Sequence, residues 1–240
     1  MLSVYFYKKL LYTIFMKNYR NILLDADNTI FDFNRAEKEA IKLTFAEFGI
    51  KCDDKLSDLY HKVNDKYWKK LEKKEVTKTE LATMRFKEIF DSYHFDIEPL
   101  IFNTRYKSNL GKQSFLLPNA LELVKYLHSL NKMLIIASNG SSTVQHNRIN
   151  NSKIKEYINA VYTSEEAGYT KPSKEFFDKL FMKFGINKED TILIGDSLTA
   201  DIKGGYEYNI DTIFFSPDNV SNNMPTYTVT SLLNIKNIIK

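Results

Sequence analysis

The chain has 240 residues, of which 43% are hydrophobic and 27% are charged. This length and composition exclude a disordered chain and allow one ordinary domain, or a compact domain with a small insert. The formal net charge is only +4, and 34 Lys+Arg residues are interspersed with 30 Asp+Glu residues. A nucleic-acid-binding surface would need basic residues gathered on one face, so we expect no nucleic-acid partner.

The cysteine and histidine residues argue against a disulfide and against zinc. Cys52 is the single cysteine, so no intrachain disulfide can form, and we expect a reducing, cytoplasmic location. No activating motif surrounds Cys52, which we interpret as a structural residue rather than a nucleophile. None of the four histidines has a second histidine or a cysteine at a metal-ligand spacing, which disfavours zinc.

Residues 1–15 carry two short apolar stretches on either side of Lys8 and Lys9. Each stretch is too short to span a bilayer, and no small-residue cleavage site follows. One interpretation is an interfacial amphipathic anchor, but two basic residues are few for stable membrane binding. We therefore expect an N-terminal appendage, or a start codon placed ahead of the true one at Met16, and no membrane partner.

Five apolar runs further along the chain predict buried strands, and a polar turn follows each of them. They are 22–24 before Asp25-Ala26-Asp27, 133–137 before Ser138-Asn139-Gly140, 159–162 before Thr170-Lys171-Pro172, 191–194 before Gly195-Asp196-Ser197, and 212–215 before Ser216-Pro217. Helical patterns lie between them, with one apolar face formed by Leu121, Val124, Leu127 and Leu130 and another within 176–184. Alternating strands and helices predict an α/β fold with a parallel sheet covered on both faces.

Residues 34–110 interrupt this alternation with amphipathic helices and no convincing strand. A capping box, Thr77 to Glu80, opens one of these helices. An all-helical insert after the first strand predicts a cap domain over the carboxyl ends of the strands, where such sheets bind ligands. The α/β core then comprises residues 16–33 and 111–240.

The polar turns carry the candidate chemistry, because parallel strands bring their carboxyl ends to one edge. Asp25 and Asp27 lie two apart on an extended segment, so both can point the same way, and their mutual repulsion favours a bound cation or a shared proton. With Asp196 they form an oxygen ligand set for a hard divalent ion. Lys171 adds positive charge, and Ser138 with the backbone N–H groups of Asn139 and Gly140 offers phosphate donors. Each motif alone is common, but their conjunction in this order is not.

The motifs Asp25-Ala26-Asp27-Asn28-Thr29, Ser138-Asn139-Gly140, Lys171-Pro172 and Gly195-Asp196-Ser197 with Asp201 resemble the four motifs of the haloacid dehalogenase superfamily. This resemblance implies a Rossmann-like core with a helical cap. It also implies that Asp25 is the nucleophile and Asp27 the general acid/base, while Ser138, Asn139 and Lys171 hold a phosphoryl group. Mg²⁺ would be bound by Asp25, the main-chain carbonyl of Asp27, and Asp196. Asp201 would lie near the metal or orient Lys171.

The same resemblance implies a magnesium-dependent phosphatase that hydrolyses a small phosphate monoester through an aspartyl-phosphate. Dehalogenases of the superfamily lack a carboxylate at the position of Asp27, which favours phosphatase chemistry. Further residues are similar to the bacterial house-cleaning pyrimidine 5′-nucleotidases: Ile30-Phe31-Asp32-Phe33, Tyr67-Trp68, Thr79-Glu80-Leu81, Arg85-Phe86, Gln145, Arg148 and Ser164-Glu165-Glu166. They imply nucleoside 5′-monophosphates as substrates. The superfamily's more common glycine is replaced by Asn28, which this subgroup tolerates.

Two alternatives stay open at this stage. One is a phosphatase or phosphomutase for sugar or other small organic phosphates, and the other is a non-catalytic binding protein on the same fold. The helical cap would decide between substrates, but aromatic residues at helical spacing are more often core than ligand contacts. We therefore assign no cap residue to the site; the physiological substrate and the oligomeric state do not follow from the sequence.

Overall fold

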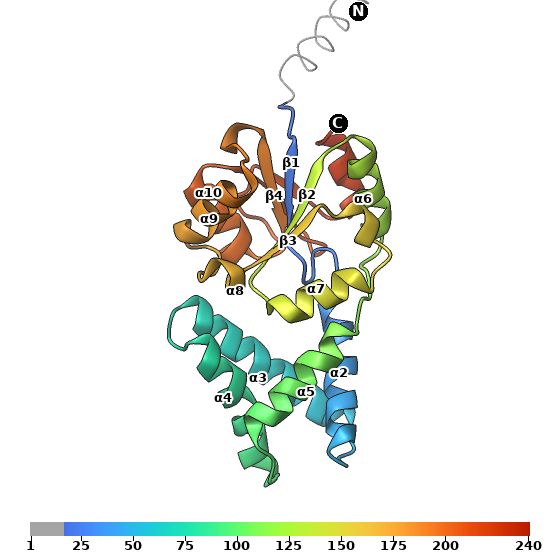
Figure 1. The fold of residues 1–240 in the computed structure, drawn as a ribbon, viewed down its shortest axis with the longest axis vertical. Helices are drawn as coiled ribbons and strands as arrows, with labels where there is room; N and C mark the ends of the chain where they lie inside the picture. Colours follow the sequence, from blue (N-terminus) through green and yellow to red (C-terminus); the bar gives the residue numbers. More distant parts are fainter. Residues whose placement is uncertain (1–16) are drawn as a thin grey trace, which may run out of the picture.

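The computed structural model describes residues 17–240, so the expected appendage at 1–15 lies outside the described residues. The core is a six-stranded sheet in the order β3-β2-β1-β4-β5-β6, and every neighbouring pair is parallel. Its strands are β1 (Asn21–Leu24), β2 (Met133–Ser138), β3 (Ala160–Thr163), β4 (Thr191–Gly195), β5 (Asp211–Phe215) and β6 (Tyr227–Val229). The predicted α/β class with a parallel sheet is confirmed (Figure 1).

Strand β1 lies at the centre of the sheet, and its register positions the polar turns. Leu24 pairs with Ile136 of β2 and with Ile194 of β4. Parallel strands in this register place the residues that follow them at one edge, which is therefore where Asp25 and Asp196 lie. Strand β6 was not predicted, because it is a three-residue edge strand whose first two residues are exposed and show no apolar run.

The strands read as continuous apolar runs because helices cover both faces of the sheet. Leu24 belongs to one apolar cluster, with Leu123 and Leu127, whereas Leu23 belongs to a cluster on the other face, with Phe177. Alternate residues of a strand point to opposite faces, which accounts for this division. The helices of this part are α6 (Ala120–Ser129), α7 (Ser142–Asn150), α8 (Ser164–Ala167), α9 (Lys174–Phe184) and α10 (Lys203–Tyr208).

Five helices separate β1 from β2, and the first four of them form an all-helical insert. These four are α2 (Phe33–Glu47), α3 (Asp54–Glu72), α4 (Lys78–Tyr93) and α5 (Pro99–Gly111). Asp53 caps α3, and the predicted capping box of Thr77 and Glu80 opens α4. The insert has its own apolar core, in which the ring centroids of Phe86 and Phe102 are 5.0 Å apart.

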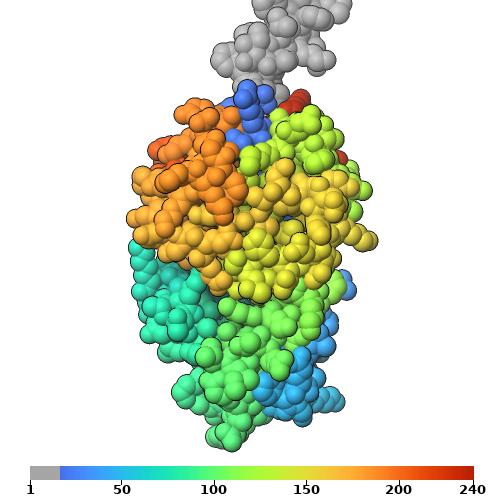
Figure 2. Space-filling model, viewed as in Figure 1, coloured from blue at the N-terminus to red at the C-terminus, as the bar shows by residue number. Residues whose placement is uncertain are grey.

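The insert lies beside the carboxyl edge of the sheet, below it in Figure 1. Helices α5 and α7 pack against each other at this junction, where the green and yellow surfaces meet in Figure 2. None of the helices in the described part of the chain is long and apolar enough to cross a membrane.

Candidate active site

Lys171 lies at the centre of the polar edge and is buried there with two carboxylates. Its ammonium donates to Asp25 Oδ1 at 2.7 Å, to Asp201 Oδ1 at 2.6 Å and to the Ala137 carbonyl at 2.5 Å. An ammonium group has three hydrogens, so these acceptors use all of them and fix its position. Asp201 thus lies against Lys171, and one of its oxygens also lies within 4.8 Å of oxygens of Asp25 and Asp196.

The site carries more negative than positive charge. Burial raises the pKa of Asp25 well above its usual value; Lys171 opposes this rise, and the carboxylates of Asp201, Asp196 and Asp27 add to it. Burial also raises the pKa of Asp196 to about 7, with a further contribution from Asp201. For Lys171, burial lowers the pKa, but Asp201 and Asp25 outweigh it and the net shift is upward. A bound cation would relieve the repulsion among these carboxylates.

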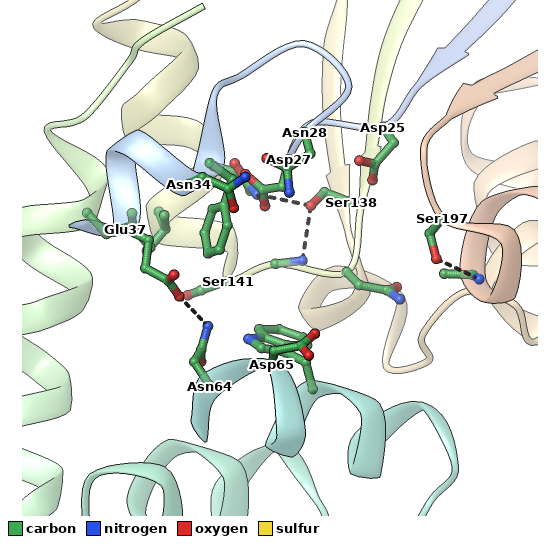
Figure 3. A pocket seen from close by; sticks show the side chains of 18 of the residues that line it. Asp25, Asp27, Asn28, Asn34, Glu37, Asn64, Asp65, Ser138, Ser141 and Ser197 are labelled. Atoms are coloured by element: carbon green, nitrogen blue, oxygen red, sulfur yellow. Dashed lines mark hydrogen bonds between the residues drawn. The ribbon is translucent and has the colours of Figure 1, made fainter. Parts of the chain in front are cut away.

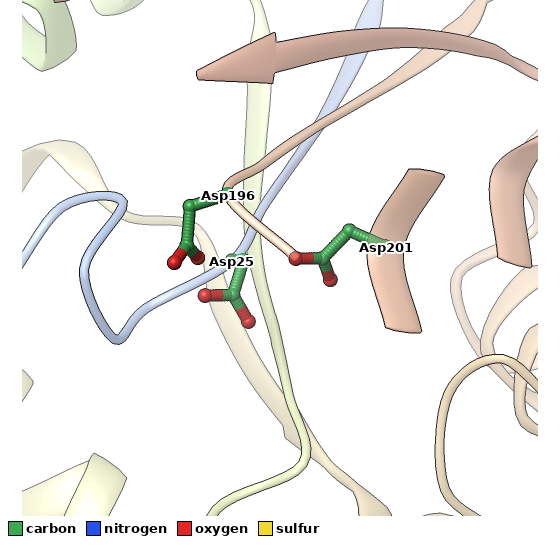
Figure 4. A group of neighbouring side chains, drawn as sticks. All are labelled: Asp25, Asp196 and Asp201. Carbon is green, nitrogen blue, oxygen red and sulfur yellow. The ribbon is translucent and has the colours of Figure 1, made fainter. Parts of the chain in front are cut away.

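Three carboxylates lie close enough to surround one ion. Oxygen atoms of Asp25, Asp196 and Asp201 lie within 4.8 Å of one another (Figure 4). Asp201 accepts from Lys171 with one oxygen and from the Ser197 N–H with the other, at 3.1 Å. Asp25 contacts Lys171 through Oδ1 only. An all-oxygen set of this kind fits Mg²⁺, so the donors present agree with the expected ion.

Glycine at position 195 makes room for Asp201. A Cβ atom placed there would lie 2.3 Å from Asp201 Oδ2, which no packing could accept. The close approach of the β4 backbone therefore holds this carboxylate against Lys171.

Asp27 is held by two buried side chains of α7. Arg148 pairs with Asp27 Oδ1, and Gln145 Nε2 donates to Asp27 Oδ2 at 2.7 Å and to Ser138 Oγ at 3.0 Å. The Arg148 guanidinium is itself fixed, because Nε donates to the Gln113 carbonyl at 2.9 Å. Sequence reasoning noted Gln145 and Arg148 only as part of a resemblance. Gln145 and Arg148 are three residues apart on a helix that follows the Ser-Asn-Gly turn. This spacing places both side chains on one face of the helix and could have suggested that they act together at the site.

The Ser138 turn is joined to the Lys171 loop through Asn139. The Asn139 side chain donates to the Lys171 carbonyl at 2.9 Å and accepts from the Lys171 N–H at 2.8 Å. Gly140 N–H donates to Ser138 Oγ at 3.0 Å. The Asn139 amide thus connects the two loops, which leaves its backbone N–H as the expected phosphate donor. Asn28 has φ +57°, a left-handed conformation that asparagine tolerates in place of glycine.

A cavity of about 290 Å³ lies between the sheet edge and the helical insert. Asp25, Asp27 and Ser138 line its sheet side, and Figure 3 shows Asn64 and Asp65 of α3 facing them. The insert contributes lining residues that the motifs do not predict: Asn34, Glu37, His61, Asn64, Asp65, Glu72, Lys107 and Leu110. Trp68 and Arg85, which stand out in the sequence only through the family resemblance, line it too, as does Tyr106. Two aromatic residues of the insert, Trp68 and Tyr106, line the cavity; Tyr106 is also buried in the insert's core, as are Tyr67, Phe86 and Phe102.

Polar contacts connect the insert to the sheet at the cavity rim. The Lys78 ammonium donates to the Asn139 carbonyl at 3.0 Å and to Ser164 Oγ at 2.5 Å, and burial lowers its pKa to about 8. On another side, Thr199 donates to Glu72 at 2.9 Å. Lys78 therefore connects the insert directly to the turn that carries Ser138.

Comparison with known proteins gives the family. The model of the haloacid dehalogenase-like hydrolases matches residues 22–215. YfnB of Bacillus subtilis is 32% identical, and the match covers 93% of this chain and 99% of YfnB. The crystal structure of YfnB, described as bound to magnesium and as revealing interdomain movement, has a TM-score of 0.86 to this structure. The pyrimidine 5′-nucleotidase PynA of Streptococcus pneumoniae is 35% identical, covering 89% of this chain and 92% of its own. The pyrimidine 5′-nucleotidase YjjG of Escherichia coli is 25% identical, covering 91% and 96%. The family expected from the four motifs is confirmed, and the chain belongs to the haloacid dehalogenase-like hydrolases.

Proposed function

We propose that the protein is a magnesium-dependent phosphatase that hydrolyses pyrimidine nucleoside 5′-monophosphates through an aspartyl-phosphate on Asp25. The observation that carries this proposal is the placement of Asp25 against the buried Lys171 ammonium, with Asp27 held beside it in the same cavity. The nucleotide assignment is supported by two relatives named as pyrimidine 5′-nucleotidases.

The residues divide the reaction into two steps. In the first, an Asp25 oxygen attacks phosphorus, the bond to the ester oxygen breaks, and Asp27 gives its proton to the leaving alcohol. In the second, Asp27 takes a proton from water, whose oxygen attacks the phosphorus and releases phosphate from Asp25. Lys171, Ser138 and the backbone N–H of Asn139 offset the charge on the phosphoryl oxygens throughout.

Asp25, Asp196 and the main-chain carbonyl of Asp27 would hold Mg²⁺. When bound, the ion supplies positive charge that lets a carboxylate approach an anionic phosphoryl group. The crowded carboxylates support this assignment, because burial and mutual repulsion raise the pKa values of Asp25 and Asp196 and a bound cation would offset that repulsion.

A phosphate-release screen tests the proposal. Wild-type protein is assayed with UMP, CMP, 3′-UMP, ribose 5-phosphate and glucose 6-phosphate, each with magnesium or with EDTA. We expect the 5′-nucleotides to have the highest kcat/KM and EDTA to abolish turnover. Better turnover of sugar phosphates would favour the alternative substrate class, and no turnover of any ester would favour a binding protein.

Arg148→Met tests the placement of Asp27. We expect kcat for UMP to fall roughly ten- to a hundredfold, because the general acid loses one of its two supports. The loss should be smaller with p-nitrophenyl phosphate, since its leaving group departs without a proton. Arg105→Met removes an exposed arginine of α5 as the matched control.

Because Arg148 is completely buried, thermal melts must show that Arg148→Met is folded, and Gln145→Met offers a second variant. Equal losses with both esters would contradict a role for Arg148 in proton transfer.

Magnesium should raise the melting temperature more at about pH 8 than at about pH 5.5. Without metal, Asp196 has a pKa of about 7 in the folded protein and about 4 in the unfolded chain, so its protonated form favours the folded state. This contribution to stability is complete below about pH 4 and is lost as the pH rises through about 7. Magnesium binds the ionised carboxylates and stabilises the folded state by mass action. Melts in magnesium and in EDTA measure the difference, and Asp196→Asn should reduce it. An equal magnesium effect at both pH values would contradict this site.

A further inference from the structure

We propose that His61 accepts a hydrogen bond from the leaving group of the substrate and helps to select that group. This inference rests on the proposed phosphatase function and adds a specificity residue to the same cavity. His61 lies on α3, lines the cavity, and has a side chain 54% exposed. Its Nδ1 lies 2.6 Å from Oε2 of Glu37, a carboxylate of α2 that is almost completely buried.

A chain of hydrogen bonds through the insert fixes Glu37. Arg85 of α4 donates from Nη1 to Asn64 Oδ1 at 2.5 Å and from Nη2 to Asn103 Oδ1 at 2.8 Å. Asn64 then donates from Nδ2 to Glu37 Oε1 at 2.6 Å. All four residues are buried, and the network joins α2, α3, α4 and α5 in the wall of the cavity, where Glu37, Asn64 and Arg85 are lining residues.

The direction of this network determines the proton position on His61. Arginine can only donate, so the Asn64 oxygen must face Arg85 and the Asn64 NH₂ group must face Glu37. An ionised Glu37 can only accept, so its other oxygen requires the hydrogen of His61 on Nδ1. In the neutral imidazole with its hydrogen on Nδ1, Nε2 carries no hydrogen and is an acceptor, whereas a protonated imidazole would donate from both nitrogens.

An acceptor in the insert half of the cavity selects a leaving group that carries a hydrogen-bond donor. In a uracil or thymine nucleoside this donor is a ribose hydroxyl or the imide N–H of the ring. Asp65 and Glu72 also line this half, and their negative charge disfavours a second phosphate there, while Lys107 of the same lining pairs with Glu165 at 3.7 Å. The chemistry is therefore that of an uncharged, hydroxyl- or imide-bearing leaving group.

His61→Phe tests the inference in the full-length protein with magnesium. The readout is kcat/KM for UMP divided by kcat/KM for p-nitrophenyl phosphate, whose leaving group has no hydrogen-bond donor. We expect this ratio to fall about three- to tenfold, mainly through KM. The matched control is His146→Phe, because His146 also pairs with a glutamate, Glu166, at 2.9 Å, but does not line the cavity.

Glu37→Gln is a second variant that should remain folded. A glutamine can accept from Asn64 and donate to His61 Nδ1, which moves the hydrogen to Nε2 and turns this acceptor into a donor. If the imide N–H is the partner, UMP loses its advantage over CMP, whose ring has an acceptor at that position. If a ribose hydroxyl is the partner, Glu37→Gln is tolerated and His61→Phe weakens UMP and CMP equally, with dUMP testing the 2′-hydroxyl.

Either of these patterns supports the inference. It is overturned if His61→Phe leaves the ratio unchanged, or if His146→Phe lowers it as much. The wild-type protein separates this failure from that of the proposed function: if it releases no phosphate from any ester, the phosphatase assignment itself is wrong.

Discussion

Asp25→Asn is expected to lower phosphate release at least about a hundredfold, with the fold intact. An amide oxygen is a poor nucleophile and a poor metal ligand. The variant therefore cannot form the aspartyl-phosphate in the first step, and the second step has no intermediate to hydrolyse. Burial raises the pKa of Asp25, and although Lys171 opposes the rise, three neighbouring carboxylates add to it, so the negative charge of Asp25 opposes folding in the metal-free protein. Removing that charge should therefore cause little loss of folding stability.

Two measurements check this expectation. Phosphate release with UMP and magnesium gives the activity, and a thermal melt shows that the variant is folded. Asp178→Asn is the matched control, since Asp178 is on α9, pairs with Lys174 at 2.6 Å and does not line the cavity. Turnover above one hundredth of wild type would contradict Asp25 as the nucleophile, and phosphoprotein trapped by acid quench in wild type but not in Asp25→Asn would support it.

The sheet could be predicted because its strands are buried on both faces. Runs such as 133–137 are then continuously apolar and end at a polar turn, which is a strong local signal. The same logic located Asp25, Lys171 and Asp196, since parallel strands share a carboxyl edge. Strand β6 gave no such signal, because it pairs only at the edge and is largely exposed.

Helix faces were predicted less exactly than strands. In α6 the fully buried residues are Ala120, Leu123, Val124 and Leu127, whereas Leu121 only packs against the margin of the core. The apolar face of α6 is wide, so the helical periodicity of the sequence does not identify which of its residues lie at the centre of the contact with the sheet. The position of the helix on the sheet decides it, and that position depends on the whole fold.

The insert side of the cavity could not be predicted from the sequence. Glu37, His61 and Arg85 come from three different helices, and nothing in their spacing indicates that they are connected. As single polar residues in amphipathic helices they are indistinguishable from solvent-exposed residues such as Lys62. Only the packing of α2, α3 and α4 brings them together, so specificity is the part of the function that needs the structure.

Lys171→Met is expected to abolish turnover and to destabilise the metal-free protein by about 3–5 kcal/mol. The substitution leaves Asp25 and Asp201 facing each other without the ammonium that both now contact, at 2.7 and 2.6 Å. Chemical denaturation in EDTA measures stability, and phosphate release measures activity. Lys174→Met is the control, because its pair with Asp178 is exposed and a surface pair contributes about 0–1 kcal/mol.

The double variant Lys171→Met/Asp201→Asn separates the structural from the chemical role of this lysine. Asp201→Asn removes the negative charge of the buried carboxylate that Lys171→Met leaves without its ammonium partner. The double variant should therefore regain part of the lost stability. Activity should not return, because the phosphoryl oxygens still lack the Lys171 charge. Recovery of turnover along with stability would mean that Lys171 serves only to hold the fold. Stability without turnover would place its charge in the reaction itself, where Asp201 acts by positioning it.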